Sequence, residues 1–268
     1  MSAAGRALRA FPSLLRVGFA EMVAYRAEVV IWILTATLPL VMLAVWDRVA
    51  ESGPVGPFDQ GGFARYFVAA LVVRQLTSSW IVWELNSAIR TGTLSIGLLR
   101  PVHPLVFPAA ESLATVPIRV LVLLPIVGLL WLWRPQMGLG LDLLHAPLFA
   151  LSVLLAWVMS FLVQTAFGCL AFWLDQSLGL FNVWFGLWAL FSGYLVPVQL
   201  FPAGFAEVAH WLPFRALLGI PVEIGAGLLR GRAALEAVGL QGAWLLVAAA
   251  VATVAWRRGI VRYGAYGA

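Results

Sequence analysis

The most informative absence in this 268-residue sequence is lysine, because all 17 basic residues are arginine. Hydrolysis of a nucleoside triphosphate by a P-loop requires a lysine that reaches the β- and γ-phosphates. Schiff-base catalysis by lysine requires the amine itself. The chain carries neither kind of site, so any work driven by nucleotide hydrolysis has to come from another protein.

Cysteine and histidine are nearly as scarce as lysine. A single cysteine, Cys169, excludes a disulfide framework and a cysteine-based metal site. The histidines His103, His145 and His210 are widely separated and form no metal-binding pair, and no serine lies in a nucleophile-elbow motif. We therefore expect a chain that is not an enzyme and that binds no metal or cofactor of its own.

Charged residues make up only 11% of the chain, against about 25% in soluble domains. Hydrophobic residues make up 62%, and the mean hydropathy is +0.95. Several apolar runs reach the roughly 20 residues that a helix needs to cross a bilayer. The arginines are dispersed around these runs, which is typical of membrane-flanking charges and not of a nucleic-acid-binding patch. The composition predicts an all-α polytopic membrane protein in which residues 1–268 form a single membrane domain.

The hydrophobic pattern divides the chain into spans and connecting segments. Residues 6–27 are amphipathic and too charged to span, which predicts an elbow helix lying in the membrane interface. Segment 84–104 links the second and third spans, and segment 197–236 is broken by proline and glycine into apolar pieces too short to cross, which favours a re-entrant helix pair. The predicted spans are 29–46, 63–83, 105–133, 146–174, 177–196 and 240–256.

The distribution of arginine predicts the orientation of these spans. Six crossings place both termini on one side of the membrane, together with segment 84–104. That side carries nine arginines near span ends, and the other side carries six. By the positive-inside rule, both termini and segment 84–104 are expected in the cytoplasm.

Three ionisable residues fall within the predicted spans: Arg74, Glu111 and Arg119. A charge at membrane depth is costly, so each residue should face protein or water and find a partner. Because spans 63–83 and 105–133 run antiparallel, Arg74 can approach Glu111. Two interpretations remain open: a structural pair that joins two helices, or the polar lining of a substrate path.

Four stretches give the sequence a family resemblance. They are the amphipathic segment 6–27, VRQLTSSWIVWELNSAIRTGTLSIGLLRPVHP at 73–104, FSGYLVPVQLFP at 191–202 followed by WLPF at 211–214, and the basic tail with YGAYG at 263–267. Together they resemble the permease subunit of bacterial type-2 ABC exporters, the ABC-2 family of transporter proteins.

The resemblance implies a half-transporter in the bacterial cytoplasmic (inner) membrane. Such a permease pairs with a second permease, which is the same or a homologous chain, and binds two copies of a cytoplasmic ABC ATPase. ATP and Mg bind to that ATPase, in agreement with the absent lysine. The implied activity is outward transport of a lipid, glycolipid, polysaccharide or hydrophobic compound.

The resemblance also assigns roles to two segments. A short helix over 88–99 is expected to dock into a groove of the ATPase, and the alternative is a plain cytoplasmic loop. The residues expected at the ATPase are Ile89, Arg90, Leu94, Ile96, Leu98, Leu99 and Arg100. The segment at 191–214 is implied to form a re-entrant outer gate that includes Gly193, Pro197, Pro202 and Pro213.

An alternative from another functional class is a non-ABC membrane protein, acting as an assembly or structural factor or as a channel. An ATPase that co-purifies with the chain would favour the exporter. The absence of such a partner would favour the alternative.

Overall fold

The computed structural model describes residues 12–13, 16, 26–142 and 145–264, and for residues 26–36 it describes the backbone alone. The predicted elbow helix at 6–27 therefore lies almost wholly outside the described residues. The described residues are helical and form no β-sheet, which confirms the all-α prediction.

Four helical stretches are long and apolar enough to cross a membrane: Gln60–Arg90, Val106–Trp133, Ala146–Phe172 and Gly231–Tyr263. They correspond to the second, third, fourth and sixth predicted spans. Helix α2 (Arg26–Val49) and the apolar helix α9 (Ser177–Phe191) correspond to the first and fifth. The 15 residues of α9 measure about 22 Å at 1.5 Å each, which is shorter than the hydrocarbon core.

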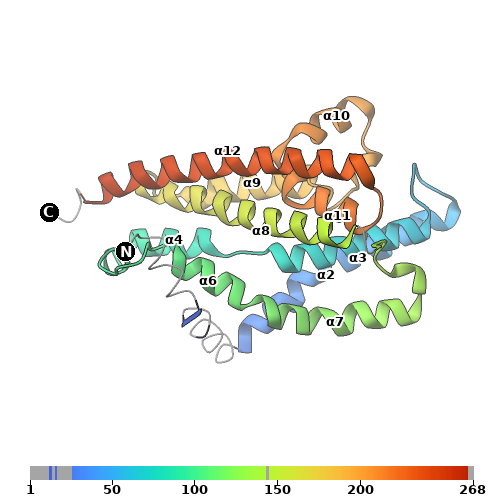
Figure 1. Ribbon diagram of the computed structural model, residues 1–268, viewed down its shortest axis with the longest axis horizontal. Coiled ribbons are helices and arrows are strands. Elements are labelled where there is room, and N and C mark those ends of the chain that lie inside the picture. Colours follow the sequence, from blue (N-terminus) through green and yellow to red (C-terminus); the bar gives the residue numbers. More distant parts are fainter. Residues whose placement is uncertain (1–11, 14–15, 17–25, 143–144, 265–268) are drawn as a thin grey trace.

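These stretches lie side by side along the long axis of the molecule (Figure 1). They are built from α3 (Gln60–Thr77) with α4 (Ile81–Arg90), α6 (Val106–Ala114) with α7 (Val116–Trp133), α8 (Ala146–Cys169) and α12 (Gly231–Gly264). The C-terminal end of α12 and helix α4 lie at one end of the molecule. The loop that joins α2 to α3 lies at the other.

The second predicted span contains a break that the sequence analysis missed. Helix α3 stops at Thr77, Ser78 is extended, and α4 starts at Ile81. The hydroxyl of Thr77 donates to the Val73 carbonyl at 2.9 Å, and Ser79 Oγ accepts from the Ile81 N–H at 3.4 Å. Serine and threonine side chains compete in this way with the helical hydrogen bonds of the backbone.

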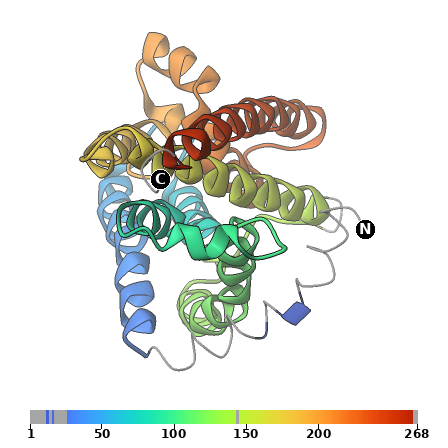
Figure 2. The ribbon, with the colours of Figure 1, turned by 90° about the vertical axis from the view of Figure 1, so that its left-hand side faces the viewer.

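The single helix predicted over 88–99 is wrong. Helix α4 continues to Arg90, and the chain then turns at Gly92, whose φ of +78° is a left-handed conformation that suits glycine. A separate helix α5 of five residues (Leu94–Leu98) follows. Figure 2 looks onto this end of the molecule, where α4 and the following segment cross in front of the bundle.

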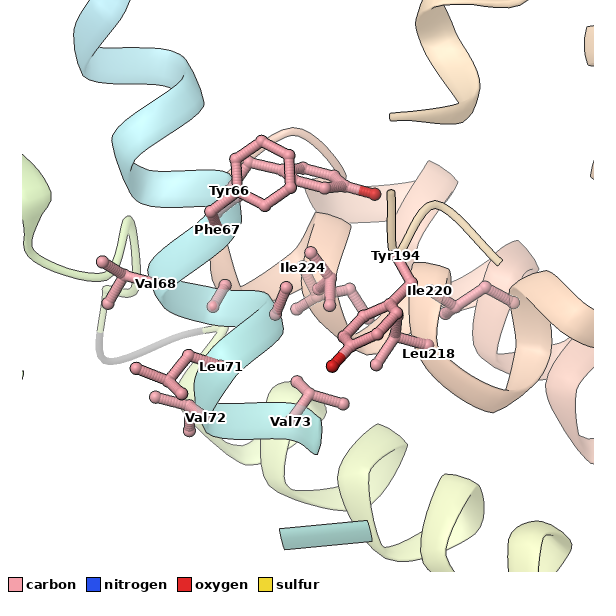
Figure 3. Close-up of a cluster of buried hydrophobic side chains, with 14 of the residues drawn as sticks. Tyr66, Phe67, Val68, Leu71, Val72, Val73, Tyr194, Leu218, Ile220 and Ile224 are labelled. Atoms are coloured by element: carbon pink, nitrogen blue, oxygen red, sulfur yellow. The ribbon is translucent and has the colours of Figure 1, made fainter. Parts of the chain in front are cut away.

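Helix α3 is the centre of the core. Apart from Arg65, every residue from 62 to 73 is buried, because α2, α7, α8 and a short internal helix surround α3. That internal helix consists of a π-helical turn, η5 (Arg215–Gly219), and α11 (Ile220–Gly225), and all of its residues are buried. Figure 3 shows Val73 on the side of α3 that faces Leu218, Ile220 and Ile224, and it shows Val68, Leu71 and Val72 on the opposite side. The stretch YFVAALVV at 66–73 is apolar on every side, and such a stretch is expected at a position surrounded by other helices.

The segment predicted as re-entrant at 197–236 does contain short helices, but its boundary was wrong because α12 already begins at Gly231. Pro197 and Pro202 are the cap residues of η4 (Val198–Leu200) and α10 (Ala203–Trp211), and Pro213 lies between α10 and η5. Proline suits these positions because its missing N–H would have no helical partner at a helix start.

Gly193 makes the turn that ends α9. Its φ is +87°, and the Tyr66 hydroxyl donates to its carbonyl at 2.8 Å. A Cβ at this position would lie 2.2 Å from Tyr66 Oη, so neither the backbone conformation nor the space admits a side chain. Helix α9 therefore ends at Phe191, whereas the fifth predicted span extends to residue 196.

We expect Gly193→Ala to lower the free energy of unfolding of the detergent-purified protein by more than the cost of a left-handed conformation alone, which is about 1–2 kcal/mol, because the clash with Tyr66 adds to this cost. The change is measured as a fall in the melting temperature. Gly204→Ala is the control, because a Cβ there meets no atom within 4 Å. Equal melting temperatures for the two variants would contradict this role of Gly193.

Candidate functional site

Arg119 stabilises the break between α3 and α4 by donating hydrogen bonds to it. Its side chain reaches from α7, and Nη1 donates to the carbonyls of Ser78 at 2.7 Å and Gln75 at 3.3 Å and to the Ser78 hydroxyl at 3.2 Å. Only 3% of Arg119 is exposed. The end of a helix leaves carbonyls without helical partners and carries partial negative charge, so a guanidinium at this position stabilises the interrupted helix.

Two pockets share a wall at this break. The first, the Arg74 pocket, has a volume of about 320 Å³ and is lined by residues that include Arg74, Ser160, Gln164, Asn182, Trp184 and Trp188. The second, the Glu111 pocket, has a volume of about 270 Å³ and is lined by residues that include Glu84, Pro108, Glu111, Ser112, Thr115 and Arg119. Ser79, Trp80 and Trp83 line both, so the break itself separates the two pockets.

Of the three charged residues predicted within the spans, Arg74 lies apart from Glu111 and Arg119. The guanidinium of Arg74 lies 5.3 Å from the ring centroid of Trp188 and 6.0 Å from that of Phe185, both on α9. Glu111 lines the other pocket, which it shares with Arg119 and not with Arg74. The antiparallel arrangement suggested an approach of Arg74 to Glu111, but the break turns the two side chains toward different pockets.

The segment expected to dock on an ATPase divides into a buried and an exposed part. Ile89 and Leu94 are buried in a cluster with Phe161, Cys169 and Phe172. Arg90 donates to the carbonyl of Asp175, in the turn between α8 and α9. The remaining residues of the expected set, Ile96, Leu98, Leu99 and Arg100, are exposed, and Leu99 reaches 87%.

The end of α12 holds this segment in place. Tyr263 Oη donates to the Gly92 carbonyl at 2.9 Å and accepts from the Ser95 N–H at 3.2 Å. His103 follows the segment, and its ring centroid lies 5.0 Å from that of Trp256 on α12. Partial desolvation lowers the pKa of His103, which favours the neutral imidazole.

Sequence reasoning missed a buried ion pair between Arg215 and Glu223. Arg215 Nη2 lies 2.5 Å from Oε2, and Nε lies 3.0 Å from Oε1, with the two side chains 4% and 0% exposed. His210 Nε2 lies 3.4 Å from Arg215 Nη1. The available signal was the stretch PFRALLGIPVEIG, in which one arginine and one glutamate interrupt an otherwise apolar run.

The four predicted gate residues lie in the connections around this pair. Gly193 and Pro197 follow α9 and are buried, Pro202 precedes α10 and is exposed, and Pro213 precedes η5. Pro213 also lines a cavity of about 290 Å³ between α8, α9 and α12. No cluster of three or more histidine, cysteine, aspartate or glutamate residues that could hold a metal occurs among the described residues.

Comparison with known families decides the identity. Residues 62–267 match the model of a family described as ABC-2 family transporter protein. The chain belongs to the ABC-2 transporter family. It is therefore a permease component of an ABC transporter and a multi-pass membrane protein, and its family generally provides the non-catalytic transport subunit beside an ABC ATPase. No curated protein sequence gives a significant match to this ABC-2 protein.

Arg119→Leu should destabilise this ABC-2 protein by about 2–4 kcal/mol, because it leaves buried carbonyls at the end of α3 without a donor. We expect Arg119→Lys to recover part of the loss. Melting of the detergent-purified protein measures the effect. Arg134→Leu, which removes a partly exposed pair with Asp47, is the control and should cost about 1 kcal/mol or less. A loss for Arg119→Leu no larger than this would argue against the capping role.

Breaking the buried ion pair from one side should cost about 3–5 kcal/mol, since the remaining charge has no partner in the core. We expect Arg215→Leu and Glu223→Leu each to lower the melting temperature more than the double variant does. Additive losses in the double variant would show that the two side chains act independently.

Proposed function

We propose that this ABC-2 protein is the permease half of an ATP-driven exporter that moves a lipid, glycolipid, polysaccharide or other hydrophobic compound outward across the bacterial inner membrane. In this proposal α2, α3 with α4, α6 with α7, α8, α9 and α12 are the six spans, and both termini are cytoplasmic. Two copies of a separate ATPase bind ATP and Mg. A second permease, identical or homologous, completes the transport path.

The observation that carries this proposal is the exposed surface of α5 at the end of the molecule where α12 finishes. Ile96 is 59% exposed, Leu98 40% and Leu99 87%, and the exposed Arg100 stands beside them. Apolar side chains on a helix of five residues beyond the membrane-length helices are suited to a protein partner. The charge of Arg100 is suited to an acidic rim on that partner.

The buried part of the same segment provides a connection to the interior. Ile89 and Leu94 pack with residues of α8, and α4 leads from them to the break at Ser78. A displacement of α5 by the ATPase would therefore also displace α4. Because Ser79, Trp80 and Trp83 line both pockets, this movement would change the shape of the Arg74 and Glu111 pockets. The short helices η4, α10, η5 and α11 lie toward the opposite end, where we place the re-entrant outer gate.

The docking proposal predicts that Ile96→Asp combined with Leu99→Asp lowers co-purification of the ATPase by about tenfold or more while leaving the melting temperature unchanged. In this test the chain is co-expressed with a candidate ABC ATPase that carries a Walker A motif. Leu235→Asp is the matched control, because Leu235 is 62% exposed on α12 at the opposite end of the bundle. Leu94→Asp should instead lower the melting temperature, because Leu94 is buried.

Retention of the ATPase by the Ile96→Asp, Leu99→Asp variant would disprove docking at α5. A well-folded wild-type protein that retains no ATPase would contradict the exporter as a whole. That result would favour the alternative of a membrane assembly factor, structural protein or channel.

A further inference from the structure

The Arg74 pocket combines one charge with hydrogen-bonding groups and aromatic walls. Among the described residues that line it, Arg74 is the only charged one. Ser160, Gln164 and Asn182 provide neutral polar groups from α8 and α9. The aromatic residues that line it are Trp80, Trp83, Phe181, Trp184, Phe185 and Trp188. Such a lining suits a ligand with a polar head and an apolar body.

The contacts of Arg74 fix its guanidinium without neutralising it. The rings of Phe185 and Trp188 lie beside its charge, with their centroids 6.0 Å and 5.3 Å from the guanidinium carbon. Cation–π contacts leave the formal charge of the guanidinium in place, and the group carries five N–H donors. Arg74 forms no ion pair within the described part of the chain. It is therefore held in position with its formal charge available to an anion.

Gln164 adds a second requirement. Its Oε1 atom is buried and has no hydrogen-bond partner in the protein. A buried carbonyl oxygen without a donor is unfavourable, so a ligand that brings a hydroxyl or an amine to this pocket gains a hydrogen bond that the protein leaves open. A positively charged amine is disfavoured by the neighbouring Arg74, which leaves the hydroxyl.

The Glu111 pocket on the other side of the break has a different charge. Glu84 and Glu111 line it together with Arg119, so carboxylates are present there and absent from the described lining of the Arg74 pocket. An anionic group that enters from the membrane is therefore favoured on the Arg74 side and disfavoured on the Glu111 side.

We propose that the Arg74 pocket binds the anionic, hydroxyl-bearing headgroup of an amphiphile, with Arg74 contacting the anion, Gln164 accepting from the hydroxyl and the tryptophans contacting the first carbons of the chain. This inference rests on the proposed function, because it makes the amphiphile the cargo of the exporter. The volume of about 320 Å³ accommodates a headgroup, and the chains extend from the pocket into the surrounding hydrocarbon.

Four probes separate the contributions of charge, hydroxyl and chain. Dihexanoyl phosphatidylglycerol carries an anion and hydroxyls, dihexanoyl phosphatidylethanol carries the anion alone, and dihexanoyl phosphatidylcholine is zwitterionic. Inorganic phosphate carries no chain. Binding to the protein in a non-ionic maltoside detergent is measured by native mass spectrometry, and each variant is first compared with wild type by melting temperature.

We expect phosphatidylglycerol to bind best and inorganic phosphate least. Arg74→Gln should weaken phosphatidylglycerol binding by about tenfold or more, because it removes a charge-assisted hydrogen bond of about 1.5–3 kcal/mol. Arg74→Lys should retain most of the affinity for phosphatidylglycerol. Gln164→Leu should weaken phosphatidylglycerol and leave phosphatidylethanol unchanged. Arg134→Gln, which removes an arginine that lines neither pocket, is the control and should affect neither lipid.

Equal binding of phosphatidylglycerol and phosphatidylcholine, or unchanged binding by Arg74→Gln, would overturn the proposal. Comparable, Arg74-dependent binding of inorganic phosphate would overturn the requirement for an amphiphile. Neither measurement uses the ATPase. A wild-type protein that retains its ATPase but does not bind phosphatidylglycerol would therefore defeat this inference alone, and one that binds the lipid but retains no ATPase would defeat the exporter function alone.

Discussion

The hydrogen bonds from Arg119 to the carbonyls of Gln75 and Ser78 are the interaction on which the centre of this protein depends. A membrane helix can be interrupted only where its freed carbonyls meet another donor, because hydrocarbon supplies none. A buried guanidinium meets several carbonyls at once and is attracted by the negative end of α3. The interruption in turn creates the wall that separates the Arg74 pocket from the Glu111 pocket.

The two ends of the molecule are stabilised by different means. At one end, apolar packing around Leu94 and the hydroxyl of Tyr263 attach the α4–α5 connection to α8 and α12. At the other, the Arg215–Glu223 pair holds η5 and α11 inside the core. Gln241 of α12 also donates to the Ala216 carbonyl there, at 2.9 Å. A buried polar network fixes a single arrangement, because every alternative leaves a charge or carbonyl unsatisfied.

Sequence reasoning about the candidate site was right about residue types and incomplete about partners. It found that Arg74, Glu111 and Arg119 need partners within the protein, because a charge in hydrocarbon is costly wherever it lies. It did not find that Arg119 meets the carbonyl of Ser78, 41 residues away, since a main-chain carbonyl leaves no mark in a sequence. Likewise, Ile89 in α4 and Ile96 in α5 are the same residue type seven positions apart, and only packing made Ile89 buried and Ile96 exposed.

The sequence by itself determined that this is a helical membrane protein without a P-loop lysine. It could do so because composition, the length of hydrophobic runs and the absence of a residue type are properties of the chain alone. The sequence also indicated the ABC-2 family. The tertiary structure decided where the helices break and which polar groups meet, including the turn at Gly193 against Tyr66. It decided these because a break inside a membrane helix persists only when a distant segment supplies the missing hydrogen bonds.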